Sequence, residues 1–525
     1  MLQGKRSKVV KNPARSPGYV SPNQLTICGF ETPFAQALTS ENCWVKLNKL
    51  LPWDKMVAQY NKLFTSAEGR QPLNGRIVIG AVIIKHMLKL SDRETVQQIQ
   101  ENVFMQYFLG YSSFTNEAPF DASLFVDIRH RLSLEVMNSI NEIVITHHFD
   151  NNPGAPTQHT ATVNNDDGPG MPPAPAKTDG AAIAEVAAPQ PPPAHKGKLL
   201  IDATVAPQNI TFPTDLKLLN AAREKSEELV DKLYCKELHG DVKPRTYRNI
   251  ARKEFLGTAK KKNKTAKQLY KANAKQLRFL KRNLAHIDML LKSYSCLPLK
   301  HKEQKYLMVL HTVYDQQYQM HSTRTHRIDD RIVNIHQPHV RPVKRGKEGK
   351  KTEFGSKLQV SLSDGFAFID KLSWDNFNEG GCLKESVALY KQRFGYYPQA
   401  VLADKIYCTR ENRKLLKALG IGLRAKPLGR PAATALPNQV SPGERNPIEG
   451  KFGQAKAGYN MECIKAKLLP TSESWIASII LVLNLVNLTR LGLYCLKQTI
   501  LLLTNWIKMI MPANSNFGRL KCSLS

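Results

Sequence analysis

The stretch from Lys198 to Ala203 reads Lys-Leu-Leu-Ile-Asp-Ala, and it decides the fold. A short apolar run of this kind is typical of a buried strand, here with an acid, Asp202, at its exit. Residues 399–404, Gln-Ala-Val-Leu-Ala-Asp, repeat the pattern and end in Asp404. Because an open α/β sheet presents ligand-binding groups at the carboxyl ends of its strands, we expect both acids at one sheet edge, where they could share a cation.

The pattern around these two strands predicts the rest of a sheet. Residues 354–372 alternate polar and apolar side chains around an Asp-Gly turn, which predicts an antiparallel hairpin. Helical patterns cover 383–394 and 410–419, and residues 421–425 indicate a further strand. The order of strand, helical insert, two antiparallel strands, helix, strand, helix, strand and helix predicts a mixed α/β sheet.

The helical insert is predicted from the spacing of its leucines. Apolar residues recur at intervals of three and four over 219–233 and again over 277–291, as in two helices packed as a hairpin. A basic stretch lies between them and contains Lys260, Lys261, Lys262 and Lys264. A lysine run is usually a solvated surface, but in a basic chain it can equally follow DNA phosphates, and both uses stay open.

The N-terminal part is predicted to be helical. Ser91 and Glu94 form a capping-box pattern that starts one helix. Another is expected from Asp121 onward and carries Arg129 and Arg131 at its end. The arrangement is compatible with a helix-turn-helix whose cations contact DNA, but cations near a helix C-terminus can also serve only to complement the helix dipole.

The composition of the chain limits which class of protein it belongs to and which kinds of partner it binds. A chain of 525 residues is too long to fold around a single hydrophobic core. They include 75 Lys and Arg against 44 Asp and Glu, a net charge of +31 that favours a polyanionic partner, with nucleic acid first. The nine cysteines are scattered without a CxxC spacing, which argues against a zinc ribbon or a disulfide framework and fits a reducing cytoplasm.

The most apolar stretch runs from Trp475 to Met511, but amide and charged residues interrupt it. A membrane-spanning helix needs about 20 largely uncharged residues. We therefore expect helices that cover the sheet, or a surface for self-association, and no membrane insertion.

A third acid, Glu449, lies in the segment Arg445–Lys456, which is interpreted as the start of a helix after Pro447. Three carboxylates suit two-metal catalysis, in which hard Mg²⁺ ions take oxygen ligands, activate a water or 3′-hydroxyl and stabilise the leaving oxygen. Phosphodiester cleavage and strand transfer both fit. Each acid alone has a simpler use as a turn former, a helix cap or a solvated side chain, so position and order together carry the prediction.

These residues resemble bacterial insertion-sequence transposases of the DDE type, whose catalytic domain is RNase H-like. The family signature runs Tyr, two residues, Arg, three residues, Glu, six residues, Lys. Arg445, Glu449 and Lys456 keep these spacings, whereas Pro442 stands at the Tyr position. Asp202 and Asp404 are similar to the family's first and second acids, and the resemblance covers most of residues 34–490.

The resemblance implies roles for these side chains. Asp202, Asp404 and Glu449 would be catalytic and would bind two Mg²⁺ ions, with Mn²⁺ as a substitute. Arg445 and Lys456 would contact DNA. The implied partners are double-stranded DNA, as terminal inverted repeats and target, and further copies of the chain in a homodimeric or larger synaptic complex. Residues 119–132 are similar to the DNA-binding region that precedes the catalytic core in this group.

We therefore predict an α/β fold: an RNase H-like mixed sheet with a helical insertion, preceded by an all-α DNA-binding domain. The expected function is a cytoplasmic DNA transposase. Two alternatives stay open, a metal-dependent nuclease of the same fold that cuts without joining, and a decayed transposase that only binds DNA. The expected parts are a basic flexible N-terminus (1–33), a helix-turn-helix-like DNA-binding domain (34–150), a Pro/Ala-rich disordered linker (151–196), the first part of the core (197–214), the basic helical insertion (215–330), the second part of the core (331–490) and an apolar helical tail (491–525).

Overall fold

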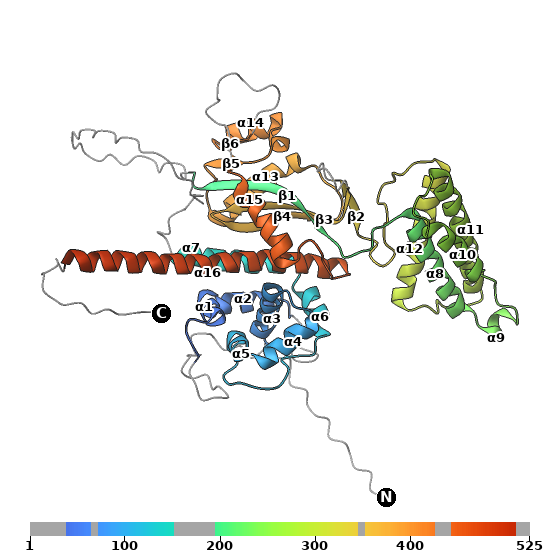
Figure 1. Cartoon of the computed structure of the whole chain (residues 1–525), viewed down its shortest axis with the longest axis horizontal. Helices are drawn as coiled ribbons and strands as arrows, with labels where there is room; N and C mark the ends of the chain where they lie inside the picture. Colours follow the sequence, from blue (N-terminus) through green and yellow to red (C-terminus); the bar gives the residue numbers. More distant parts are fainter. Residues whose placement is uncertain (1–37, 65–71, 152–194, 345–351, 426–442, 511–525) are drawn as a thin grey trace, which may run out of the picture.

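A mixed sheet of six strands is central to the fold. The computed structural model describes residues 38–64, 72–151, 195–344, 352–425 and 443–510, without the side chains of 491–510 (Figure 1). The expected linker, the N-terminal residues 1–33 and Pro442 lie outside the described residues, apart from the linker's end residues. The strands are β1 (Lys198–Pro207), β2 (Arg341–Lys344), β3 (Thr352–Ser363), β4 (Phe366–Ser373), β5 (Ala400–Leu402) and β6 (Gly422–Arg424).

The pairing of these strands confirms the predicted mixed sheet. Strand β1 is antiparallel to β3 and parallel to β5, and β5 is parallel to β6. Both β4 and the short β2 pair with β3 in antiparallel orientation. Strands β3 and β4 form the predicted hairpin, whose Asp364 and Gly365 have φ of 48° and 81°. Positive φ at both residues is the backbone that a tight two-residue hairpin turn requires.

The predicted end of β1 was wrong. The strand runs to Pro207 rather than Ala203, so Asp202 lies inside it and pairs with Val360 of β3. The β-branched residues Thr204 and Val205 continue the pleated ladder past the acid, and this is the physical reason for the longer strand. Asp404 does follow its strand: it is the N-cap of the short 3₁₀ helix Lys405–Tyr407.

Helices cover both faces of the sheet. Leu199 and Ile201 of β1 pack in one cluster with α13 (Leu383–Phe394) and α14 (Arg410–Ala418). Leu200, on the opposite face, packs in a second cluster with the N-terminal helices and the long α16 (Leu469–Ile510). The short α15 (Asn446–Gly453) lies against β1. It is followed by one π-helical turn, Gln454–Gly458.

The N-terminal helices share that second core with the sheet. Helix α16 contacts α1, α3, α6, α7 and strand β4, and it lies between the sheet and the N-terminal helices (Figure 1). The capping box of Ser91 and Glu94 is formed as predicted. These helices are α1 (Cys43–Leu50), α2 (Trp53–Asn61), α3 (Gly75–Leu88), α4 (Asp92–Glu101), α5 (Val103–Leu109), α6 (Leu124–Arg131) and α7 (Leu134–Asn151).

The apolar C-terminal stretch is used as core up to Arg490, where the description of its side chains ends. Within the described residues, one helix, Leu469–Arg490, is long and apolar enough to cross a membrane, with a mean hydropathy of 1.5. In this structure 78% of that apolar window is buried against other parts of the chain. Its apolar side chains therefore have protein partners, as expected for a helix that covers the sheet.

The helical insertion forms a body with its own core (Figure 1). Its leucines at spacings of three and four pack α8 against α11, as predicted, and α12 contacts both. The insertion lies between β1 and β2 in the chain. Its helices are α8 (Asp215–Leu233), α9 (Lys236–His239), α10 (Arg248–Ala259), α11 (Ala266–Leu291) and α12 (His301–Ser322).

Candidate functional site

Two acids predicted from separate strands form ion pairs with the same arginine side chain. The guanidinium of Arg445 lies 3.2 Å from Oδ2 of Asp202 and 3.3 Å from Oδ1 of Asp404. Asp202 comes from the interior of β1, Asp404 from the end of β5, and Arg445 is the N-cap of α15. Ile448, fully buried one turn into α15, anchors this helix in the core next to β1. Parallel pairing of β1 with β5 and docking of α15 thus place the three groups together.

Burial and like charges act on Asp202. Its side chain is 19% exposed, whereas that of Asp404 is 52% exposed. Desolvation raises the pKa of Asp202, and the neighbouring carboxylates of Glu379 and Asp404 raise it further. The Ala203 N–H, which donates to this carboxylate, and Arg445 lower the pKa, but the net direction is upward. A partly buried acid with like-charged neighbours, such as Asp202, is stabilised by a bound cation.

The third predicted acid does not join the pair. Glu449 is exposed on α15, one helical turn beyond Arg445. Among the described residues, no three His, Cys, Asp or Glu side chains lie close enough to hold a metal ion together. Asp202 and Asp404 supply hard oxygen donors that suit Mg²⁺ or Mn²⁺, but the Arg445 guanidinium lies between them. Two of the three predicted carboxylates are therefore placed to bind a divalent cation together. The convergence of all three stays a prediction.

The Arg445 guanidinium has a hydrogen-bond donor that is not paired within the described residues. Nε of Arg445 is buried and has no hydrogen-bond partner within the part of the chain that the structure describes. The adjacent Glu444, which pairs with Arg424 at 3.3 Å, has a buried carboxylate oxygen in the same condition. Unpaired buried polar atoms are costly, and they gather here at the start of α15.

The sequence prediction missed two residues of this site. Glu379 begins a short 3₁₀ helix, Glu379–Cys382, and raises the pKa of Asp202 by like charge. It pairs at 2.8 Å with Lys357, a buried lysine of β3. Glu379 follows no apolar run and fits no motif spacing, so only the tertiary fold brings it close to Asp202. Lys357 was read only as a polar position of the hairpin.

Lys456 lies in the π-helical turn that follows α15. The sequence prediction placed it on roughly the same helix face as Glu449 by assuming 3.6 residues per turn. A π turn closes i→i+5 hydrogen bonds, so that spacing does not carry over to Lys456. Its predicted contact with DNA stays a prediction.

The two arginines at the end of α6 have different surroundings. Arg129 is buried, and both terminal nitrogens of its guanidinium donate to the Asp92 carboxylate at 2.8 and 2.9 Å. This ion pair ties α6 to α4, so the predicted DNA contact of Arg129 conflicts with the structure. Arg131 is exposed over the ring of Phe64, and its predicted DNA contact stays a prediction.

The lysine run is exposed as expected. Lys260, Lys261, Lys262 and Lys264 lie in the segment that joins α10 to α11, at the surface of the insertion. Exposure is required for phosphate contacts but is equally expected of a solvated loop, so it does not decide between the two uses.

Comparisons with known proteins give matches in two regions. The family model "Transposase domain (DUF772)" matches residues 33–131, and the model "Transposase DDE domain" matches residues 401–486. The second range contains Asp404, Arg445, Glu449 and Lys456 but not Asp202. The match implies an RNase H-like fold for that region.

One known protein matches a short stretch of the chain. An 88-residue stretch is 33% identical to "Uncharacterized protein ORF8 in nfe locus" of Rhizobium meliloti. The aligned region spans 17% of this chain and 42% of that relative. No solved structure matches the chain.

Proposed function

The chain belongs to the transposase family, with a DUF772 transposase domain and a DDE transposase domain, and from this premise we propose that it is a DNA transposase that cleaves transposon ends and transfers them to target DNA. The observation that carries the proposal is the ion-paired cluster of Asp202, Arg445 and Asp404. It joins an acid outside the matched DDE region to one inside it, at the place where β1 and β5 run side by side.

In this proposal each side chain has a distinct task. Asp202 and Asp404 would hold the divalent cation, and Glu449 would supply the third carboxylate. A bound Mg²⁺ or Mn²⁺ pair would activate water for cleavage and the 3′-hydroxyl for transfer. Arg445 neutralises the two aspartates in the free protein and offers its unpaired Nε–H to a phosphate oxygen of the DNA. Lys456 and Arg131 are proposed as further phosphate contacts.

The partners follow from the same proposal. The substrates are the terminal inverted repeats and a target duplex, and two ends must be held by two or more copies of the chain. The cytoplasm, where DNA is accessible and thiols stay reduced, is the proposed location.

Cleavage of a labelled end duplex tests the proposal. Asp404→Asn should abolish Mg²⁺-dependent cleavage and leave binding of the duplex within about twofold, because the substitution removes a carboxylate but no cation. Asp315→Asn, the same change at an exposed site on α12, is the matched control and should cleave normally. Retained cleavage by Asp404→Asn would refute the assignment. With the wild type, pre-cleaved ends should join to a target duplex, whereas cutting without joining would indicate a nuclease.

A further inference from the structure

The positive charge of the chain is concentrated in one segment of the insertion. Residues 243–282 contain 15 Lys and Arg and a single acid, Glu254. Their net charge of +14 is nearly half of the +31 carried by 525 residues. A balanced solvated surface would mix both signs, so a concentration of this kind indicates a polyanion as partner.

The structure gathers these cations on two helices and the loop between them. Helices α10 and α11 pack on each other, and residues 260–265 connect them. Asn249, Arg252 and Lys253 of α10 and Lys260 just after it line a shallow open groove together with Leu256 and Gly257. Among the described residues, no atom outside the neighbouring backbone of α10 lies within 4 Å of where a Cβ of Gly257 would project. The backbone of α10 is therefore accessible to a partner at the centre of its basic face.

Helix α11, which packs on α10, also carries exposed cations. Lys267, Lys271 and Arg278 are exposed there and recur at spacings of four and seven residues, along one side of the helix. Together with Arg252 and Lys253 of α10 and the lysines of the loop they form what we call the basic edge of the insertion. No acid interrupts this edge except Glu254, which is paired with Lys275 at 2.7 Å.

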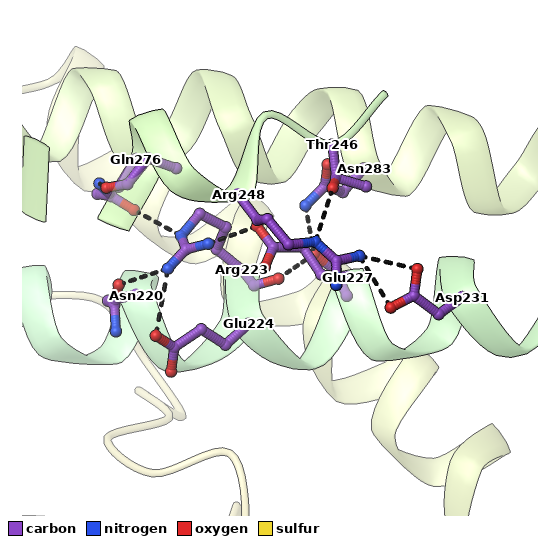
Figure 2. Close-up of polar contacts among 11 residues, drawn as sticks. Asn220, Arg223, Glu224, Glu227, Asp231, Thr246, Arg248, Gln276 and Asn283 are labelled. Carbon is purple, nitrogen blue, oxygen red and sulfur yellow. Dashed lines mark hydrogen bonds and ion pairs between the residues drawn. The ribbon is translucent and has the colours of Figure 1, made fainter. Parts of the chain in front are cut away.

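A buried polar network fixes the helices that carry the basic edge (Figure 2). Arg223 of α8 is buried and donates to Gln276 of α11 at 3.1 Å and to Asn220 at 2.8 Å, and it also pairs with Glu227. Gln276 in turn donates to the carbonyl of Ala251 in α10 at 3.1 Å.

Two further contacts complete the framework. Arg248, at the start of α10, donates to both carboxylate oxygens of Asp231 in α8 at 2.8 Å (Figure 2). Asn283 of α11 donates to the hydroxyl of Ser226 in α8 at 2.9 Å. Three helices are thus tied by directional hydrogen bonds, so the basic edge is presented on a rigid support.

The proportion of lysine to arginine side chains indicates how the basic edge recognises its partner. Ten of the 15 cations are lysines, which act as point charges and contact phosphates without base selectivity. Arginine, which reads guanine through its planar fork, is scarcer here, and two arginines are already engaged. Arg248 pairs with Asp231, and Arg282 stacks 4.3 Å above the ring of Tyr247.

We propose that the basic edge is a sequence-independent binding surface for the phosphate backbone of duplex DNA, separate from the end-recognition and catalytic sites. The identification of the polyanion as DNA rests on the proposed function. The duplex held there is either the target or the DNA that flanks the terminal repeat. Both have the same phosphate chemistry and neither has a fixed sequence.

The salt dependence of DNA binding tests the proposal. Arg252, Lys253, Lys267 and Lys271 are changed to Gln in the full chain, and dissociation constants for a random-sequence duplex are measured from 50 to 300 mM KCl. Each lost phosphate contact lowers the slope of log K against log[salt] by about 0.9, so the slope should fall by about 3 to 4. The matched control changes Lys217, Lys292, Lys302 and Lys305, four exposed lysines of the insertion outside residues 243–282, and should keep the slope within about 1 of wild type.

The outcomes are separable from those of the cleavage test. A slope that stays within about 1 of wild type in the basic-edge variant, or an equal fall in the control, overturns the proposal. A second variant, Lys260, Lys261, Lys262 and Lys264 to Gln, touches only the loop, so a loss of helix structure cannot explain a fall in its slope. If the basic-edge variant lowers the salt slope for the end duplex but leaves the slope for the random-sequence duplex unchanged, the proposed sequence independence is overturned. If Asp404→Asn still cleaves, the catalytic assignment fails while these slopes still decide the basic edge.

Discussion

Replacing Asn484 by leucine tests how firmly the N-terminal helices are joined to the sheet. Asn484 of α16 is fully buried, and its amide makes three hydrogen bonds. Oδ1 accepts from the Ala367 N–H of β4 at 2.8 Å, and Nδ2 donates to the Ala367 carbonyl at 2.7 Å and to Oδ1 of Asn141 in α7 at 2.8 Å. The side chain therefore links α16, α7 and the sheet at one point.

The expected loss can be worked from these bonds. Leucine branches at the same atom as asparagine but is larger, so in this buried position it can only add a packing cost. Three hydrogen bonds worth about 1 kcal/mol each also disappear. The buried N–H of Ala367 and the buried Oδ1 of Asn141 are each left without a partner, which adds about 1 kcal/mol each, for a loss from polar contacts of about 5 kcal/mol. Asn487→Leu, on the same helix, removes a single bond to the Gly365 carbonyl and should cost about 1 kcal/mol.

Urea unfolding followed by tryptophan fluorescence measures the loss. All five tryptophans lie outside the insertion, so the signal reports on the N-terminal helices, the sheet and α16. The structure predicts one cooperative transition that shifts strongly in Asn484→Leu and weakly in Asn487→Leu. Equal shifts in the two variants, or separate transitions of the N-terminal helices and the sheet in wild type, would refute the shared core.

Three further predictions concern single residues. Arg129→Gln should lower the free energy of unfolding by about 2 kcal/mol, because the Asp92 carboxylate loses its bidentate partner but keeps its ion pair with Lys85, and should leave the salt slope of DNA binding unchanged, which a binding titration checks. Gly355→Ala should cost about 2 kcal/mol or more in urea unfolding, because the new Cβ would lie 2.1 Å from the Ala206 carbonyl oxygen, whereas Gly381→Ala, with nothing within 4 Å, is the control. Since the pKa of Asp202 is raised on folding, its stabilising contribution is present below the unfolded pKa and lost as pH rises through the folded pKa. Asp202→Asn should therefore be more stable than wild type at pH 7 without divalent metal, and unfolding measured from pH 3 to 7 should show this advantage shrinking toward acid pH.

Local patterns in the sequence were sufficient for five of the six strands, whereas the short β2 was not predicted. The start of β1 at Lys198, the turn at Asp364 and the capping box at Ser91 each depend on neighbouring residues only, and each formed where predicted, whereas the end of β1 did not. Asp404 was placed correctly for the same reason, since the end of a short strand is a local feature.

Tertiary contacts decided the rest. Arg129 lies at the end of a helix that is compatible with a helix-turn-helix, but both of its terminal nitrogens donate to Asp92, 37 positions earlier. Glu379 belongs to no motif and reaches the site through the fold of the segment after β4. The packing of α16 on both the N-terminal helices and β4 likewise depends on residues more than 100 positions apart, which no periodicity records.

The central claim is that Asp202, Asp404 and Glu449 bind the same pair of divalent ions. The most direct measurement is anomalous diffraction at the manganese edge from the wild-type chain crystallised with Mn²⁺ and a pre-cleaved end duplex. The account predicts manganese peaks in contact with carboxylates of all three residues, with the Arg445 guanidinium moved from between the aspartates to a DNA phosphate. Manganese bound elsewhere, or bound by the aspartates while Glu449 stays remote, would contradict it.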